Sequence, residues 1–137
     1  IVGKKTYAKL VKYIAALPVK TTIWDKTNHK LSEFICGCKK KYCNGYPAEL
    51  DSDIISVIED VEAEFGLPVI ITSGLRCVKY NKIVGGISNS KHLQGKAADI
   101  SLNFKSTNDQ KLHAYLLKHP KVSYTYTGFG AVHFDVK

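Results

Sequence analysis

Residues 88–100, SNSKHLQGKAADI, bring together a histidine and an acid that could bind a metal ion. His92 and Asp99 lie seven residues apart, around a glycine and two alanines whose small size lets the backbone approach an ion closely. A catalytic zinc takes three protein ligands, commonly histidine and carboxylate, and keeps a fourth position open for water or substrate. His92 and Asp99 can supply two of these three ligands.

The C-terminal stretch AVHFDV offers a third ligand. Its alternation of apolar and polar residues predicts a strand, from which His133 and Asp135 project on the same face. A lone histidine in such a strand is more often structural. Here two histidines and two acids could converge on one ion from neighbouring segments, and this combination favours a metal site.

These motifs together resemble the zinc D-alanyl-D-alanine carboxypeptidase and endopeptidase family, which cleaves peptidoglycan. The resemblance covers about residues 31–137 and rests on three separated motifs in order: TSGLRCVKYNKIVGGISNS, the SxHxxGxAxD pattern of residues 90–99, and VHFDV. It implies an α+β fold with a small, mainly antiparallel sheet flanked by helices, shared with the hedgehog signalling domain. It also implies one zinc ion held by His92, Asp99 and His133.

The resemblance also implies roles for residues around the ion. Arg76, the only arginine of the chain, falls where the family binds a substrate carbonyl or carboxylate, and a guanidinium fork suits either group or an oxyanion. Ser90 is expected to support the ligands or to hydrogen-bond substrate. Tyr126 could line a substrate groove, although alternating aromatic residues in a hairpin more often serve packing.

The general base is where the sequence departs from the family pattern. Related enzymes place an acid three residues before the last histidine ligand, and that position is Gly130. Asp135 is the nearest replacement, but it could equally orient a ligand histidine. Two functions therefore stay open: a zinc peptidase with Asp135 and Arg76 as catalytic groups, and a weak or inactive zinc module that binds cell-wall peptide or a protein partner.

The four cysteines, Cys36, Cys38, Cys43 and Cys77, form a separate group. They could make two disulfides in an oxidising compartment, or hold a second, structural zinc ion. Their spacing lacks the paired C-x2-C motifs of common zinc ribbons, so disulfides are the favoured prediction for an exported protein. A bridge to Cys77 would tie the EFICGC stretch to the segment that carries Arg76.

Hydrophobic spacing predicts three helices that must position these side chains. The first covers residues 5–17 and ends at Pro18; the second begins at a cap, Asp51 or Ser52, and stops at Gly66. The third covers residues 106–119 and turns Leu112, Tyr115 and Leu116 inward. Between the first two helices, residues 31–47 are predicted as loop or short extended structure.

The remaining segments predict strands and turns. Residues 67–74 form a β-branched run that predicts a buried strand, residues 96–104 predict a second strand, and residues 122–137 predict a hairpin broken by Gly128 and Gly130. Gly85 and Gly86 are expected to form a turn that presents the ligand loop. The other histidines are expected at the surface: His29, His113 and His119.

The length of 137 residues and the hydrophobic content of 45% predict one domain, with a helical extension over residues 1–30 and a family-like core over residues 31–137. We expect a monomer. No apolar run is long enough to cross a bilayer, and the lysine-rich beginning does not fit a signal peptide. Because the sequence contains no methionine, we expect a processed product or an excised domain.

The formal net charge of +8 predicts attraction to polyanions. With a single arginine, the chain lacks the guanidinium forks on which sequence-reading surfaces depend, so nucleic acid is the weaker candidate. Peptidoglycan peptide stems and anionic cell-wall polymers are the expected partners. The expected location is secreted, periplasmic or cell-wall, or the protein is a phage-encoded endolysin that acts on a host wall.

Overall fold

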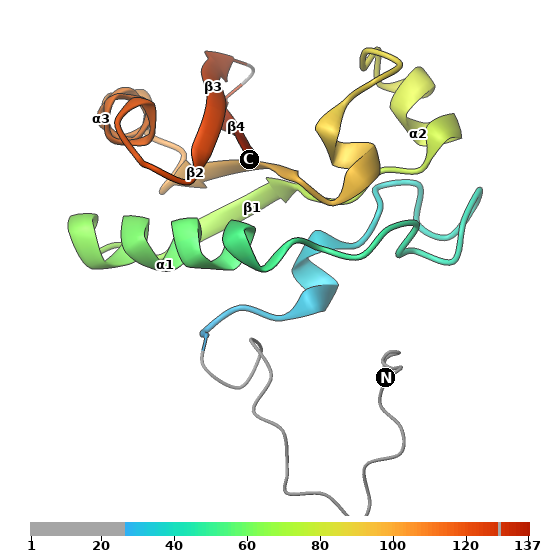
Figure 1. Ribbon diagram of the computed structural model, residues 1–137, viewed down its shortest axis with the longest axis horizontal. Coiled ribbons are helices and arrows are strands. Elements are labelled where there is room, and N and C mark those ends of the chain that lie inside the picture. The colour runs from blue at the N-terminus through green and yellow to red at the C-terminus, as the bar shows by residue number, and fades with distance from the viewer. Residues whose placement is uncertain (1–26, 129) are drawn as a thin grey trace, which may run out of the picture.

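The fold is an α+β arrangement in which a four-stranded antiparallel sheet is flanked by helices (Figure 1). The structure is a computed structural model that describes residues 27–128 and 130–137. The predicted fold class is therefore confirmed, whereas the helix expected over residues 5–17 lies outside the described residues. The elements run in this order: η2 (Leu31–Phe34), α1 (Ser52–Phe65), β1 (Val69–Ser73), α2 (Val78–Ile83), η3 (Lys91–Gln94), β2 (Ala97–Leu102), α3 (Ser106–Leu117), β3 (Val122–Gly128) and β4 (Ala131–Val136).

The sheet has the strand order β1-β2-β4-β3, so that β2 and β4 are central. β3 and β4 form the predicted hairpin. β1 lies at an edge, and Val69 is its only fully buried residue, so the prediction of a buried strand at residues 67–74 was wrong in this respect. Composition predicts that a segment is a strand, but its burial depends on neighbours that come from distant parts of the sequence.

One face of the two central strands builds the core. Alternate residues of β2 and β4 are completely or almost completely buried there: Ala98, Ile100, Leu102, Val132, Phe134 and Val136. They join Ile54 and Ile58 of α1 and Leu112 and Leu116 of α3 in a single hydrophobic cluster. Because side chains alternate across a strand, the intervening residues, Asp99, His133 and Asp135 among them, face the other side of the sheet.

The ends of α1 follow the predicted capping residues. The Asp51 carboxylate accepts a hydrogen bond from the Asp53 backbone nitrogen at 2.9 Å, which settles the choice between Asp51 and Ser52. Gly66 ends the helix in the left-handed conformation, with φ 64°. α3 likewise covers the predicted segment, with Leu112 and Leu116 fully buried.

Three short helices are absent from the sequence-based prediction: η2, α2 and η3. None exceeds six residues, which is too short for a periodic apolar pattern to appear. η2 lies within residues 31–47, which were predicted as loop or extended structure. η3 carries His92, so the ligand loop contains a helical turn that the glycine-rich sequence does not indicate.

Two histidines predicted at the surface are buried instead. The His29 side chain contacts the carboxylates of Glu33 at 2.7 Å and Glu62 at 3.0 Å. His119 Nε2 contacts the Asp60 carboxylate at 2.7 Å. Each histidine is buried because its polar atoms pair with acids from a neighbouring element, an arrangement that local sequence does not reveal.

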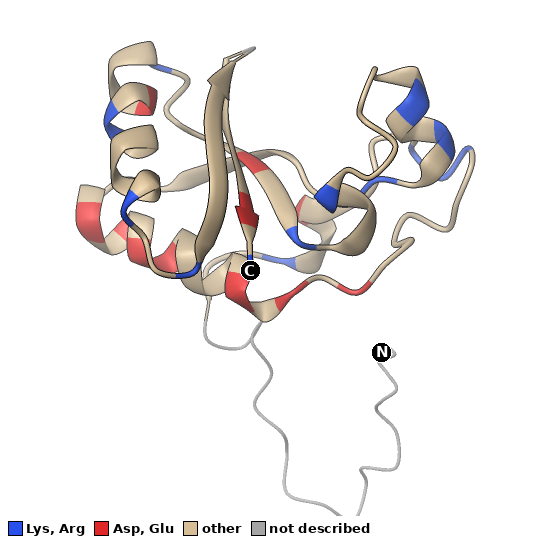
Figure 2. Ribbon diagram, turned by 45° about the horizontal axis from the view of Figure 1, so that its top comes forward, with Lys and Arg blue, Asp and Glu red and all other residues tan. Residues whose placement is uncertain are grey.

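Charge is unevenly distributed over the fold (Figure 2). Acidic residues line α1, whereas lysines gather on α2 and on the loops beside it. The basic end is therefore the end that carries α2 and η3, next to Arg76. Within the part of the chain that the structure describes, no helix has the length and apolar character needed to span a bilayer.

Candidate metal centre

The register of the sheet places four polar side chains in a row across its four strands. Asp99 pairs with Ser73 of β1 and with His133 of β4, and His133 pairs with Tyr126 of β3. Residues that are opposite one another in an antiparallel sheet share a face and lie about 5 Å apart. The sheet alone therefore brings Asp99 and His133 together.

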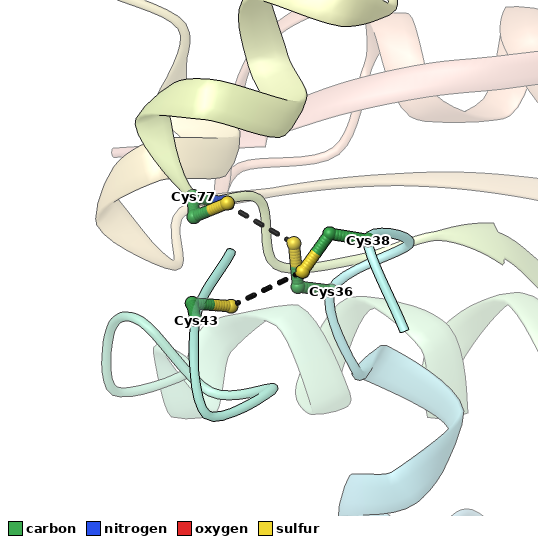
Figure 3. Close-up of side chains that lie close together, drawn as sticks. All are labelled: Cys36, Cys38, Cys43 and Cys77. Atoms are coloured by element: carbon green, nitrogen blue, oxygen red, sulfur yellow. Dashed lines mark hydrogen bonds between the residues drawn. The ribbon is translucent and has the colours of Figure 1, made fainter. Parts of the chain in front are cut away.

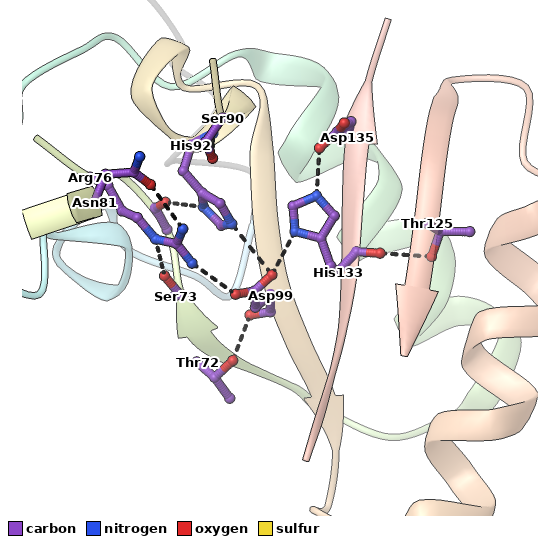
Figure 4. A network of polar contacts seen from close by, with 11 residues as sticks. Thr72, Ser73, Arg76, Asn81, Ser90, His92, Asp99, Thr125, His133 and Asp135 are labelled. Carbon is purple, nitrogen blue, oxygen red and sulfur yellow. Dashed lines mark hydrogen bonds and ion pairs between the residues drawn. The ribbon is translucent and has the colours of Figure 1, made fainter. Parts of the chain in front are cut away.

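His92 reaches this row from η3. The Ser90 hydroxyl caps the turn by accepting from the His92 backbone nitrogen at 3.3 Å, and Gly95 ends the turn with φ 73°. A Cβ at Gly95 would collide with the carbonyl oxygen of Glu49, so only glycine fits this crossing of two chain segments. The His92 side chain is almost fully buried and points toward Asp99 (Figure 4).

The three residues predicted as zinc ligands lie close together in the structure. One ligand atom from each of His92, Asp99 and His133 lies within 4.8 Å of the other two. Asp99 Oδ1 is 3.4 Å from His92 Nε2 and 2.8 Å from His133 Nδ1. Ligand atoms about 2.0–2.1 Å from a tetrahedral zinc are separated by roughly 3.3 Å, so only small movements would make room for an ion.

The hydrogen bonds on the other ring nitrogens fit the same assignment. His92 Nδ1 donates to the Gly74 carbonyl at 2.6 Å, and His133 Nε2 donates to Asp135 Oδ1 at 2.6 Å. When the two rings are neutral, these bonds leave the other nitrogen of each ring with a lone pair directed toward Asp99. His92 Nε2 is the only buried side-chain nitrogen or oxygen of the described residues without a hydrogen-bond partner. Two ring lone pairs and a negatively charged carboxylate repel one another, so a cation bound among the three groups would stabilise the arrangement.

The charges of this cluster shift two pKa values. Burial by itself would raise the pKa of Asp99, but the contacts of its carboxylate with the His133 and His92 rings outweigh burial and hold that pKa well below its usual range. Burial would lower the pKa of His133, yet its contacts with Asp99 and Asp135 raise it above the ordinary value. Asp99 is therefore an anion at neutral pH, as a metal ligand must be.

Arg76 lies at the edge of this cluster. One terminal guanidinium nitrogen is 3.4 Å from Asp99 Oδ2, the other donates to Asn81 Oδ1 at 3.2 Å, and Nε donates to the Ser73 hydroxyl at 3.4 Å. A Cβ at Gly86 would collide with the Asn81 amide oxygen. The turn at Gly85 and Gly86 thus leaves room for the residue that holds Arg76.

Three residues of the site were not predicted: Ser73, Gly74 and Asn81. Ser73 and Asn81 hold the Arg76 guanidinium, and the Gly74 carbonyl fixes the His92 ring. Ser73 ends β1, and the sequence does not show which residue of the neighbouring strand it faces. Asn81 lies on a helix of six residues that local sequence does not indicate, so no signal identified it.

The remaining predicted site residues lie around the ligands. Asp135 contacts the ring nitrogen of His133 that faces away from Asp99. The Tyr126 ring stacks on the His133 ring, with 4.8 Å between centroids, and keeps 43% of its surface exposed. Ser90 is buried against η3. Gly130 lies in the turn between β3 and β4 with φ 77°, where it has no side chain to offer.

The four cysteines meet in a second cluster, but not as disulfides. All four are free thiols, and the sulfurs of Cys38 and Cys43 are 3.5 Å apart. A disulfide needs about 2.05 Å. The favoured prediction of disulfides is therefore wrong for this structure, in which the four sulfurs lie within 4.8 Å of one another instead.

Comparison with known proteins supports the grouping of these motifs. A model of the peptidase M15 family matches residues 27–135, which is nearly the whole described chain and includes the three clustered ligands. A comparison with curated proteins gave no match. The order of the motifs, the fold and the family match agree, and the chain therefore belongs to the peptidase M15 family.

Proposed function

We propose that this protein is a zinc-dependent metallopeptidase that hydrolyses amide bonds in peptidoglycan stem peptides. Membership of the M15 family, whose peptidases are metal-dependent, supports the class of enzyme. The single observation that carries the proposal is the ligand set of His92, Asp99 and His133, with the buried His92 Nε2 lacking a hydrogen-bond partner. A three-ligand set of this kind leaves a coordination position for water or substrate, as catalytic zinc sites do.

The residues of the chain prepare this site for hydrolysis. A bound zinc ion supplies Lewis acidity that polarises a carbonyl and acidifies a water molecule. His92, Asp99 and His133 would hold it, with Gly74 and Asp135 fixing the two histidine rings. Asp99 lies between the two histidine rings and beside Arg76. Tyr126 stacks on His133 and keeps much of its surface exposed, so it would be able to contact a bound peptide.

Arg76 would bind the oxygen that becomes negative during hydrolysis, or the terminal carboxylate of a stem peptide. Its guanidinium is held from two sides by Ser73 and Asn81, so little conformational entropy is lost when it engages an anion. A preorganised donor of this kind stabilises charge better in a partly buried site than in water, and 15% of the Arg76 side chain remains exposed. D,D-carboxypeptidase and endopeptidase activities both agree with this arrangement.

The direct test is the release of new amino groups from purified peptidoglycan. The zinc-loaded protein is expected to release them, a chelator to abolish the release, and added zinc to restore it. The matched control is His113→Ala, which changes a histidine outside the ligand set, beside His92→Ala within it. If the parent binds zinc and leaves walls of several bacterial types intact, the proposed activity is wrong.

A second function is favoured by one observation at the position of the general base. Gly130 stands where related enzymes have an acid, and the carboxylate of Asp135 is occupied by His133. A weak or inactive zinc module that binds wall peptide or a protein partner would need no base. Retention of the protein on peptidoglycan without any new amino groups would support this second function.

The proposed location follows the proposed substrate. The enzyme would act outside the cytoplasm, in the periplasm or cell wall, or as a phage-encoded endolysin. The net charge of +8 would attract it to anionic wall polymers, and the lysines beside α2 lie near the proposed site. We propose that it works as a monomer, because all three ligands come from one chain.

A further inference from the structure

The cysteine cluster, defined as Cys36, Cys38, Cys43 and Cys77, joins two segments that are distant in sequence (Figure 3). The first three cysteines lie in the loop after η2, and Cys77 directly follows Arg76 and caps α2. Cys36, Cys38 and Cys77 are buried, and Cys43 is half-buried. The sulfurs all lie within 4.8 Å of one another, which is a converging set rather than two separate pairs.

We propose that the cysteine cluster is a second, structural zinc site with four thiolate ligands. Zinc–sulfur distances of about 2.3 Å in a tetrahedron place the sulfurs roughly 3.8 Å apart. The Cys38 and Cys43 sulfurs, at 3.5 Å, are close to this separation and far from disulfide length. Four sulfur ligands select zinc over the harder divalent cations, and a full set of four leaves no open position for catalysis.

The backbone around the cluster is arranged to stabilise negative sulfur atoms. Backbone N–H groups donate to three of them: Cys77 to Cys36 at 3.3 Å, Gly45 to Cys43 at 3.3 Å, and Tyr80 to Cys77 at 3.4 Å. Donors directed at ligand sulfurs are the usual outer shell of a metal–thiolate site. They have a weaker role beside neutral thiols, which are poor acceptors.

The surrounding charge is complementary to such a site. Four thiolates and one zinc ion carry a net charge of −2, and the loop that supplies three of the ligands also contains Lys39, Lys40 and Lys41. Lys41 and Lys79 both approach the Tyr42 ring, at 5.4 and 5.6 Å from its centroid. The three lysines directly follow Cys38 in the chain, so the loop that would carry the excess negative charge of the proposed site also carries positive charge.

The proposed ion would also position Arg76. It would tie the loop after η2 to Cys77, the residue next to Arg76 and the cap of the helix that carries Asn81. Gly37 permits this contact, because a Cβ there would collide with the Tyr80 ring of the same helix. The inference does not depend on the proposed peptidase function, since the ligands of the two sites are different residues.

The test measures metal content and metal ligation in the full chain, purified under reducing conditions with zinc supplied. About two zinc ions per chain are expected in the parent and about one in His92→Ala, from which the histidine site is lost. X-ray absorption on His92→Ala should then show four sulfur neighbours at about 2.3 Å. This sample retains all four cysteines, so it does not depend on a cysteine variant that folds poorly.

A cysteine variant provides the matched comparison. Cys43→Ser is expected to lose one zinc ion relative to the parent, while Ser32→Ala, an exposed substitution on the adjacent η2, is expected to keep both. Nitrogen or oxygen neighbours alone in His92→Ala, or no bound zinc in it, would overturn the proposal. So would a parent mass that lacks the four thiol hydrogens after purification without reductant, because it would show two disulfides. If the protein does not cleave peptidoglycan, the expected zinc content and sulfur ligation stay the same, so the two proposals can fail independently.

Discussion

Each ligand histidine uses one ring nitrogen for a fixed hydrogen bond and turns the other toward Asp99. Gly74 and Asp135 are the fixed partners, at 2.6 Å in both cases. Such partners select the tautomer and the ring orientation of a metal ligand. The two acids of the site thus have different surroundings, because Asp99 lies between the rings and Asp135 lies behind one of them.

Two substitutions can distinguish the two possible roles of Asp135, orienting His133 and acting as the general base. Asp135→Asn keeps an oxygen that can accept from His133 Nε2 but cannot take up a proton at neutral pH, whereas Asp135→Ala removes both properties. If Asp135 orients His133, we expect Asp135→Asn to retain zinc and most of kcat, and Asp135→Ala to lose about 10–100-fold in zinc affinity. Zinc affinity and kcat on a stem peptide are the two measurements.

The opposite pattern would assign Asp135 as the general base. In that case Asp135→Asn keeps zinc and KM near those of the parent but loses about 100-fold or more in kcat. Equal zinc affinity and equal kcat in the parent and both variants would contradict both roles. The sequence alone could not decide between them, because it shows that Asp135 and His133 share a face but not which ring nitrogen the carboxylate meets.

Arg76 is expected to act on the transition state through its fork of donors. Arg76→Lys keeps the charge but loses the planar geometry that Ser73 and Asn81 hold, so kcat/KM should fall about 100-fold or more while zinc content stays the same. Lys82→Ala, an exposed change on α2, is the control. An unchanged kcat/KM for Arg76→Lys would remove Arg76 from the substrate site.

The three candidate ligands and Arg76 could be selected from the sequence because their residue types occur in a recognisable order along the chain. Ser73, Gly74 and Asn81 could not, because each acts through a contact that only the folded chain creates. The Gly74 contact is a backbone carbonyl, which no residue type reveals. Sequence therefore identified the groups that would touch the ion and missed those that hold them in place.

Among the elements, η3 packs closely against the preceding chain segment at Gly95, the residue that ends it. Gly95 and Gly66 both have positive φ, so an alanine at either position pays the cost of a left-handed conformation, about 1 kcal/mol or more. Only at Gly95 would the new Cβ also collide with a backbone oxygen, that of Glu49; at Gly66 it meets nothing within 4 Å. We expect Gly95→Ala to lower the free energy of unfolding clearly more than Gly66→Ala in urea titrations. Equal losses would show that the crossing at Gly95 is not tight.

A pH effect is expected where η2 meets α1. Burial lowers the pKa of His29, but hydrogen bonds and negative charge from Glu33 and Glu62 outweigh it, so the folded-state pKa lies above the ordinary 6.5. The pairing of protonated His29 with the two glutamates therefore stabilises the folded state fully below about pH 6.5, and this stabilisation is lost as pH rises through the folded-state pKa. The difference in unfolding free energy between the parent and His29→Gln should be largest below about pH 6.5 and should shrink as the pH rises above that value. A difference that stays constant or grows with pH would contradict this pairing.

The strands and the two long helices of the described chain could be predicted, but their arrangement could not. Alternation in residues 96–104 and 131–136 predicts strands, whereas the pairing of Asp99 with both Ser73 and His133 is a matter of register and strand order. The position of β1 at the sheet edge follows from that order, and so does its partial burial. The two buried histidines, His29 and His119, were missed for a similar reason: their acidic partners lie on α1 and η2.

In the molecule as a whole, two clusters of metal-binding residues flank the same arginine. The histidine cluster lies on the open face of the sheet, and the cysteine cluster lies where the loop after η2 meets α2. Arg76 contacts Asp99 of the first and precedes Cys77 of the second. Lysines gather on α2 and the loops beside it, next to this region, while acidic residues line α1 (Figure 2).

The most direct test of the proposed function is the mass of stem peptides recovered from peptidoglycan after incubation with the zinc-loaded protein. We predict either stem peptides that have lost a terminal D-alanine or cross-linked stems that have separated. Both changes should be absent with His133→Ala, which removes one ligand. Unchanged peptide masses, with zinc bound in the parent at the histidine site, would contradict hydrolysis of peptidoglycan as the function of this protein.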